Sequence, residues 1–398
     1  MCNPNGGDSE PPMAFFRNRT VNLLNLHYAI HSIALTGGGA FFGAYLVRAG
    51  VPMPLVLVSF AAILLGRFAI RPVVVPLAVR FGVRVLVIAG TCMSALQYPL
   101  LSFVHGVGPA LYVLCAMSAV GDTVYWSTYH AYFAALGTDE HRGHHVGARE
   151  AIAAIVGIIS PLLTGFVLMQ FGPQVAFGAT GLVLLVAALP LLATPDVRVA
   201  ADAPGAYRGS LSGIKLFLCD GWIVGTGYTV WQLALFLSLG ENFLHFGGAL
   251  ALAALAGAVA GMFLGRTIDS GHGVRMTALA LGSYGCLIVL RAASLREPWL
   301  AVATNALASA GSCLYAPTLM TAVYNQAKRA PCTLRFHVAT EGGWDVGAAS
   351  GLLIAAFLVS QGTPVPMVLL LPLIGLAFAF VQLRRYYARA SQLTSMAV

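Results

Sequence analysis

Charged residues are scarce in this chain. Only 9% of its 398 residues are Asp, Glu, Lys or Arg, against roughly a quarter in a typical soluble domain, and 58% are hydrophobic. The mean hydropathy is +0.81. This composition excludes an ordinary soluble protein and leaves almost no chain for a separate catalytic or nucleotide-binding domain. It predicts an all-α protein that crosses a membrane many times.

Motifs of enzymes and cofactor sites are also missing. The chain has no GxSxG, Walker loop or HExxH motif. Its seven cysteines are scattered without a CxxC pair, which argues against a zinc site or a disulfide framework. The net charge of +8 is spread over short loops, so we expect no nucleic-acid partner. We therefore predict no enzymatic activity and no cofactor.

Long apolar stretches, in contrast, follow one another along the chain. With turn signals between them, they predict twelve spans, at 22–47, 53–78, 84–104, 108–134, 145–170, 174–193, 214–239, 245–267, 275–295, 298–326, 336–360 and 364–386. The one sizeable loop separates six helices from six. The predicted organisation is a tail at 1–21, a bundle at 22–193, a linker at 194–213, a bundle at 214–386 and a tail at 387–398.

The basic residues of the loops predict the orientation. With the N-terminus inside, one side collects Arg80, Arg84, Lys328, Arg384 and most other basic residues, whereas the other holds only Arg48 and Arg296. Cytoplasmic loops carry the excess of Lys and Arg. The first thirteen residues lack an apolar signal core, so we expect no cleaved signal peptide. We expect a multi-pass protein of the cell inner membrane, in contact with its lipid bilayer, with both termini in the cytoplasm.

The most informative polar stretch is 335–345, which opens an apolar run ending near Ser360. His337, Glu341 and Asp345 are four apart, so an α-helix places them on one face. Ionisable groups at membrane depth normally face a polar cavity or one another and mark a transport or proton path. The alternative is that they lie near the interface and hold helices together.

A weaker version of this stretch lies in the first half, where a basic loop runs into a predicted span that carries Glu150 early. The chain therefore looks duplicated. We expect protons to be carried by Glu341 and Asp345, assisted by Glu150 or by a histidine such as His337.

This layout of six plus six helices resembles the major facilitator superfamily over nearly the whole chain. A recurring loop of that family, Gly-x-x-x-Asp-Arg-x-Gly-Arg-like, is matched in the second half by Gly265, Asp269 and Arg275. Its first-half counterpart keeps Arg80, Gly82 and Arg84 but has Val79 where the family usually has Asp. We therefore expect this gating loop to be held differently here.

The resemblance implies two bundles related by a pseudo-twofold axis, with a substrate site between them and transport by alternating access, usually in a monomer. A Gly/Pro pattern between Gly157 and Gly165 resembles a motif of antiporters and favours efflux. The fourth span, however, lacks the Arg that proton-coupled drug antiporters carry there, so their proton relay cannot be transferred.

Two arginines in the second span are the strongest cationic signal. Arg71 is close enough to the helix end to snorkel, whereas Arg67 is not. Arg67 either receives an anionic group of the substrate or forms a buried pair with Asp122 or Glu150.

Further candidates for the cavity are aromatic and polar residues of other spans. In the fourth span Asp122, Tyr125 and Tyr129 share one face, and an interfacial aromatic belt is the alternative. The full set of expected substrate-binding residues is Arg67, Asp122, Tyr125, Trp126, Tyr129, His31, Tyr228, Trp231, Gln232, Asn305 and Trp344. We interpret Asp220 as a helix cap and Arg291 as a snorkelling residue.

His27 and His31 lie four apart in the first span. Imidazoles at this spacing can chelate a metal, so they are weak candidates for metal ligands. The alternatives are a proton or substrate role for His31 and simple hydrogen bonds to neighbouring backbone.

Together these features predict a secondary transporter of a small, amphipathic and anionic organic solute, coupled to protons. A transition-metal transporter and a multidrug exporter of the same fold remain alternatives, as does a membrane receptor that binds a ligand without moving it.

Overall fold

A computed structural model of the chain describes residues 19–136, 142–268 and 273–396. The side chains of 134, 135, 142–153, 263–268, 273, 274, 276 and 389–396 lie outside this description. The described residues form helices and no β-strand.

The first half of the chain forms a set of long helices with short connections. Its elements are α1 (Arg19–Ala34), η2 (Leu35–Gly39), α2 (Phe42–Arg48), α3 (Met53–Ile70), η3 (Arg71–Val73), α4 (Val74–Phe81), α5 (Val83–Leu101), α6 (Pro109–Leu136), α7 (Arg142–Gln170), α8 (Gly172–Ala188) and η4 (Leu189–Ala193).

The second half repeats this pattern. Its elements are η5 (Arg208–Ser210), α9 (Leu211–Val224), η6 (Gly225–Thr229), α10 (Val230–Ser238), α11 (Phe243–Ile268), α12 (Gly273–Ser294), α13 (Pro298–Arg329), α14 (Thr333–Ser360), α15 (Val365–Val368) and α16 (Pro372–Met396).

All twelve predicted segments contain helix, but fewer than twelve meet the criteria for a membrane span. In the described part of the chain nine helical segments are long and apolar enough to cross a membrane. The helices Pro109–Leu136, Arg142–Gln170 and Leu211–Ser238 are not among these nine. A polytopic membrane protein is therefore supported, and the count of twelve spans stays a prediction.

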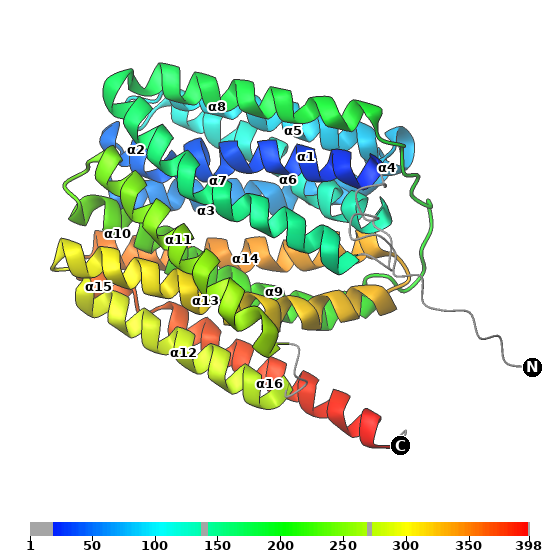
Figure 1. The fold of residues 1–398 in the computed structure, drawn as a ribbon. Helices are drawn as coiled ribbons and strands as arrows, with labels where there is room; N and C mark the ends of the chain where they lie inside the picture. Colours follow the sequence, from blue (N-terminus) through cyan, green and yellow to red (C-terminus); the bar gives the residue numbers. More distant parts are fainter. Residues whose placement is uncertain (1–18, 137–141, 269–272, 397–398) are drawn as a thin grey trace, which may run out of the picture.

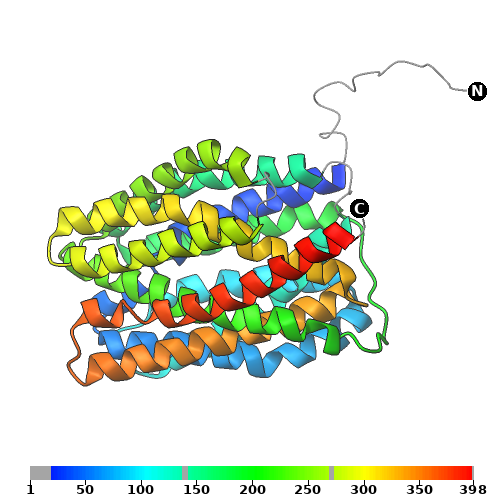
Figure 2. The same ribbon diagram turned by 90° about the horizontal axis from the view of Figure 1, so that it is seen from below.

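The helices lie side by side in an elongated bundle, with α1–α8 on one side and most of α9–α16 on the other (Figure 1). Between them α14 packs against α3 of the first half and α9 of the second, and α7 packs against α11. Seen from below, α16 (red) crosses the second-half face and ends at the end of the bundle where α1 (blue) begins (Figure 2).

The first helix of each half is interrupted at an equivalent place. A π-helical segment, η2, separates α1 from α2 at Gly37–Gly39, and a second one, η6, separates α9 from α10 at Gly225–Thr229. Gly37 leaves helical geometry, with ψ at −105°. Such π segments often occur at functional sites, and here both border the central cavities described below.

The two halves touch at both ends of the bundle. Away from the end where α1 begins, Phe41 of the first half lies against Phe246 and Phe243 of the second, with ring centroids 5.4 Å and 6.1 Å apart. At the opposite end the contact is made by charges. The cavities lie between these two contacts.

Candidate functional site

Charges from both halves of the chain meet where α3 and α14 cross. Arg71 donates a hydrogen bond from Nη1 to Glu341 Oε2 at 2.7 Å and from Nε to Asp345 Oδ2 at 3.1 Å. Its Nη2 atom also donates to Asp345 Oδ2, and Nη1 reaches the Ser127 hydroxyl at 2.8 Å. Arg67 Nε lies 3.1 Å from Asp345 Oδ1. We call Arg67, Arg71, Glu341 and Asp345 the charge cluster.

The charge cluster is shielded from solvent. The side chain of Asp345 is 0% exposed and that of Arg71 only 3%. Arg71 therefore does not snorkel, because its guanidinium is held by two carboxylates of α14. Arg67 pairs with Asp345, which sequence reasoning did not propose as its partner. Two arginines and two carboxylates leave the cluster formally neutral.

Two histidines adjoin the cluster beside Glu341. His130 Nε2 lies 3.8 Å from Glu341 Oε1. The ring of His337, which is buried, stacks on His130 with centroids 6.1 Å apart. His337, Glu341 and Asp345 are thus all buried along α14, as their spacing predicts, and His130 joins them from α6. Groups that can exchange protons are arranged in a row here.

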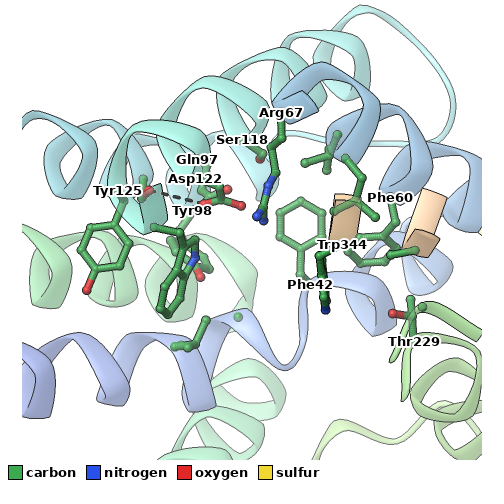
Figure 3. A pocket seen from close by; sticks show the side chains of 18 of the residues that line it. Phe42, Phe60, Arg67, Gln97, Tyr98, Ser118, Asp122, Tyr125, Thr229 and Trp344 are labelled. Carbon is green, nitrogen blue, oxygen red and sulfur yellow. Dashed lines mark hydrogen bonds between the residues drawn. The ribbon is translucent and has the colours of Figure 1, made fainter. Parts of the chain in front are cut away.

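The first of two central cavities, cavity 1, adjoins the charge cluster at Arg67 and has a volume of about 240 Å³. Figure 3 shows the Arg67 side chain extending from α3 toward Asp122, with Trp344 on the neighbouring wall. Asp122 accepts a hydrogen bond from Ser94 at 3.5 Å. Arg67 therefore belongs both to the cavity and, through Asp345, to the charge cluster. Predicted residues that line cavity 1 are His31, Arg67, Asp122, Tyr125, Trp126 and Trp344.

Trp344 is held in the cavity wall by the second half of the chain. Its Nε1 donates to Asp220 Oδ2 at 3.0 Å, and Tyr315 donates to Asp220 Oδ1 at 2.7 Å. Its ring lies 5.8 Å from the Arg67 guanidinium carbon. The interpretation of Asp220 as a helix cap is therefore wrong, because both carboxylate oxygens bind side chains from other helices.

The second cavity, cavity 2, has a volume of about 580 Å³. It shares Leu35, Gly39, Phe60 and Thr229 with cavity 1, so the two cavities are adjacent. Predicted residues on its wall are Tyr228, Gln232 and Asn305. Arg291 lines it too, so the interpretation of Arg291 as a snorkelling residue is wrong.

Two predicted substrate-binding residues lie behind the walls. Tyr129 and Trp231 are fully buried and line neither cavity. Tyr129 stacks on Tyr125 with centroids 5.4 Å apart, and Trp231 donates from Nε1 to Asn305 at 2.8 Å. Each thus supports a residue of the cavity wall. Glu150 lies outside the described side chains.

The histidine pair of α1 is engaged with the protein. His27 contacts the Ala187 carbonyl at 2.7 Å through Nδ1 and the Tyr125 hydroxyl at 3.0 Å through Nε2. His31 stacks on Tyr125 at 4.3 Å and faces cavity 1. The described residues contain no group of three or more His, Cys, Asp or Glu that could hold a metal ion.

The first-half loop that is predicted to act as a gate binds a carboxylate from elsewhere in the chain. Asp196, which follows η4, accepts the backbone N–H of Arg84 at 3.1 Å and lies 3.3 Å from Arg198 Nε. Arg84 also donates to the Thr194 carbonyl at 2.9 Å. Asp196 therefore supplies a carboxylate to the loop in which Val79 stands where the family usually has Asp.

The remaining gating residues are less informative. Arg80 lies over the ring of Phe81 at 5.1 Å, and Arg275 is exposed. Gly265 belongs to α11, and Asp269 lies outside the described residues. Sequence reasoning missed the roles of Asp196, Asp220 and Arg291, whose partners lie far away in the sequence, so no local pattern could have indicated them.

Comparisons with known proteins agree on the fold. The sequence profile described as Major Facilitator Superfamily matches residues 30–331. A search of curated proteins found no match. Among solved structures, the chain is similar to the POT family transporter PepTSo, with a TM-score of 0.67 and 13% identity over 94% of this chain and 99% of that one.

Two further structures are similar at the same level. A bacterial homologue of the iron transporter ferroportin, in an inward-facing state, has a TM-score of 0.66 and 14% identity over 94% of this chain and 99% of that one. The nucleoside transporter NupG has a TM-score of 0.67 and 11% identity over 93% of this chain and 99% of that one. At these identities the likeness concerns the fold alone.

Proposed function

Because the chain belongs to the major facilitator superfamily, we propose that this membrane transporter is a secondary active carrier that couples protons to the movement of a small organic solute. The bundles at 22–193 and 214–386 would rock about cavities 1 and 2, with 194–213 as their linker. A monomer suffices for this mechanism, since both cavities form within one chain.

The observation that carries the proposal is the charge cluster between α3 and α14. Two arginines of the first half bind two carboxylates of the second. Separating the halves at this end would pull these opposite charges apart, at a cost in Coulombic attraction. A proton on Glu341 or Asp345 would neutralise the carboxylate and weaken its hold on arginine. Protonation would thus favour opening of that end.

The route for protons is supported by His130 and His337. His130 of α6 lies 3.8 Å from Glu341, and His337 of α14 stacks on His130. Histidine can accept and release protons near neutral pH. We propose that they pass protons between Glu341 and the aqueous side at the end where α14 begins.

Coupling to the solute would run through Arg67. This residue lines cavity 1 and pairs with Asp345. A solute that changes the position of Arg67 would weaken its pair with Asp345 and so alter the proton affinity of the cluster. Substrate and proton would then bind interdependently, as linkage requires.

The basic residues near the two ends of the bundle support one orientation of the protein in the membrane. Arg80, Arg84, Lys328 and Arg384 lie at the end of the bundle where α1 begins, and the opposite end holds Arg48 and Arg296. We propose that the basic end faces the cytoplasm of the inner membrane, with both termini there. Opening of the charge cluster would then open the cytoplasmic side.

The test is transport by purified protein in proteoliposomes. Labelled octanoate, a lipophilic cationic dye and Mn²⁺ would be offered with and without an imposed proton gradient. We expect one class to accumulate above its level in protein-free liposomes, and a protonophore to abolish this excess. Equal flux with and without the gradient would refute proton coupling, and binding of a compound without any flux would indicate a receptor.

A further inference from the structure

Arg291 of α12 is the charged residue of cavity 2. Its Nη2 donates to Asn305 Oδ1 at 3.2 Å, and its guanidinium carbon lies 4.9 Å from the centroid of the Trp231 ring. The Nε atom is buried and has no acceptor in the described part of the chain. No described Asp or Glu forms an ion pair with it. The guanidinium therefore retains unused donors.

The position of Arg291 is fixed by its surroundings. Asn305, which is 2% exposed, accepts from Trp231 Nε1 at 2.8 Å and donates to the Ala249 carbonyl at 3.2 Å. Its Oδ1 atom is thus aimed at Arg291 by contacts with α10 and α11. A snorkelling arginine needs no such support. A cation fixed at membrane depth without a counter-charge is costly and is typical of a ligand site.

The other two arginines near the cavities are already paired. Arg67 and Arg71 share Asp345, and Arg71 also binds Glu341. Among the described residues, the wall of cavity 2 contains no Asp, Glu, Lys or His, and its other polar groups are neutral, among them Tyr228, Gln232 and Tyr284. The charge of this cavity is therefore positive and comes from Arg291.

Apolar side chains line the boundary between cavity 2, which contains Arg291, and cavity 1. Leu35 and Phe60 line both cavities, and Phe42, Leu64 and Leu352 continue the apolar wall in cavity 1. A solute lying here would meet a cation at one end and hydrocarbon along its body. Guanidinium binds carboxylates through two parallel hydrogen bonds, a geometry that Lys cannot offer.

We propose that Arg291 is the anion-binding residue of the transporter and receives the carboxylate of an amphipathic solute whose apolar body lies along Phe60. This inference rests on the proposed function, because it names the solute class for the same site. The sequence pointed to Arg67 of the second span as the residue that binds the anion, whereas this inference assigns that role to Arg291 of α12.

The experiment measures equilibrium binding to purified full-length protein in detergent. The probes are octanoate and 4-phenylbutyrate, each compared with its uncharged amide. Because Arg291 lies over Trp231, a bound carboxylate should change tryptophan fluorescence as well as raise the melting temperature. We expect both carboxylates to produce these changes and the amides not to. Arg291→Gln should weaken carboxylate binding by at least about tenfold, whereas Arg291→Lys should retain part of it.

The matched control is Arg48→Gln. Arg48 is exposed, pairs with Glu241 and lines neither cavity, so its loss should leave carboxylate binding unchanged. Gel filtration and the unliganded melting temperature would verify that each variant is folded. Equal responses to acid and amide, an unchanged response in Arg291→Gln, or no response to either carboxylate would each overturn the inference.

Failure of the carboxylate subsite and failure of proton-coupled transport would give different experimental results. Binding in detergent requires neither a membrane nor a gradient. Carboxylate binding that depends on Arg291, without gradient-driven accumulation in proteoliposomes, would refute proton-coupled transport alone. Gradient-driven accumulation of the cationic dye or Mn²⁺, unaffected by Arg291→Gln, would refute the carboxylate subsite alone.

Discussion

Arg67 Nε lies 3.1 Å from Asp345 Oδ1, although the two residues belong to opposite halves of the chain. Arg67 also lines cavity 1, whereas Asp345 is completely buried beneath it. This contact joins the place where a solute can bind to the place where a proton can bind. A coupled transporter requires a physical link of this kind.

Replacing Asp345 by Asn should destabilise the protein, because Arg67 loses its carboxylate while remaining largely buried. Breaking a buried pair on one side costs about 3–5 kcal/mol, so we expect a clear fall in the melting temperature in detergent. The double variant Arg67→Gln, Asp345→Asn should regain part of the loss. Arg67→Gln alone completes the cycle, and a double-variant loss equal to the sum of the two single-variant losses would show that the two residues are not energetically coupled.

Trp344→Phe should lower both stability and transport. Phe keeps an aromatic ring beside Arg67 but removes the Nε1 donor from Asp220, and an unsatisfied buried acceptor costs about 1–3 kcal/mol. Melting temperature and solute uptake would be measured together. Trp299→Phe is the matched control, because Trp299 is 68% exposed and lines neither cavity. Similar effects at the two positions would contradict the role given to Trp344.

Gly82→Ala should destabilise the protein more than Gly106→Ala. Both glycines have φ of +85°, so an Ala is strained at either position. A Cβ at Gly82 would collide with the Asp196 carboxylate, whereas a Cβ at Gly106 would meet nothing within 4 Å. The difference in melting temperature therefore reports on the contact of Asp196 with the gating loop. Equal losses would show that Asp196 gives way freely.

Local patterns in the sequence were sufficient to predict the helices and some shared faces. The predicted span 336–360 corresponds to α14 at Thr333–Ser360, because hydropathy depends only on neighbouring residues. The four-residue spacing of His337, Glu341 and Asp345 likewise led to one buried stripe. Helical periodicity fixes such relationships without any knowledge of tertiary structure.

Pairing between distant residues could not be predicted in this way. Arg67 was expected to pair with Asp122 or Glu150, yet its partner is Asp345 of the other half. Arg291 looked like an interfacial residue because it stands near a helix end, and only Asn305 and Trp231 show that it faces inward. Asp220 and Asp196 were also misjudged or overlooked, since their partners come from other helices.

Proton binding by Glu341 is the central step of the proposed transport cycle. The measurement is the pH change inside dye-loaded proteoliposomes when the transported solute is added, compared between the unmodified protein, Glu341→Gln and Glu297→Gln. Glu297 is an exposed carboxylate outside both cavities and the charge cluster. We predict a solute-triggered pH change in the unmodified protein and in Glu297→Gln, and none in Glu341→Gln. An undiminished proton flux in Glu341→Gln would contradict the account.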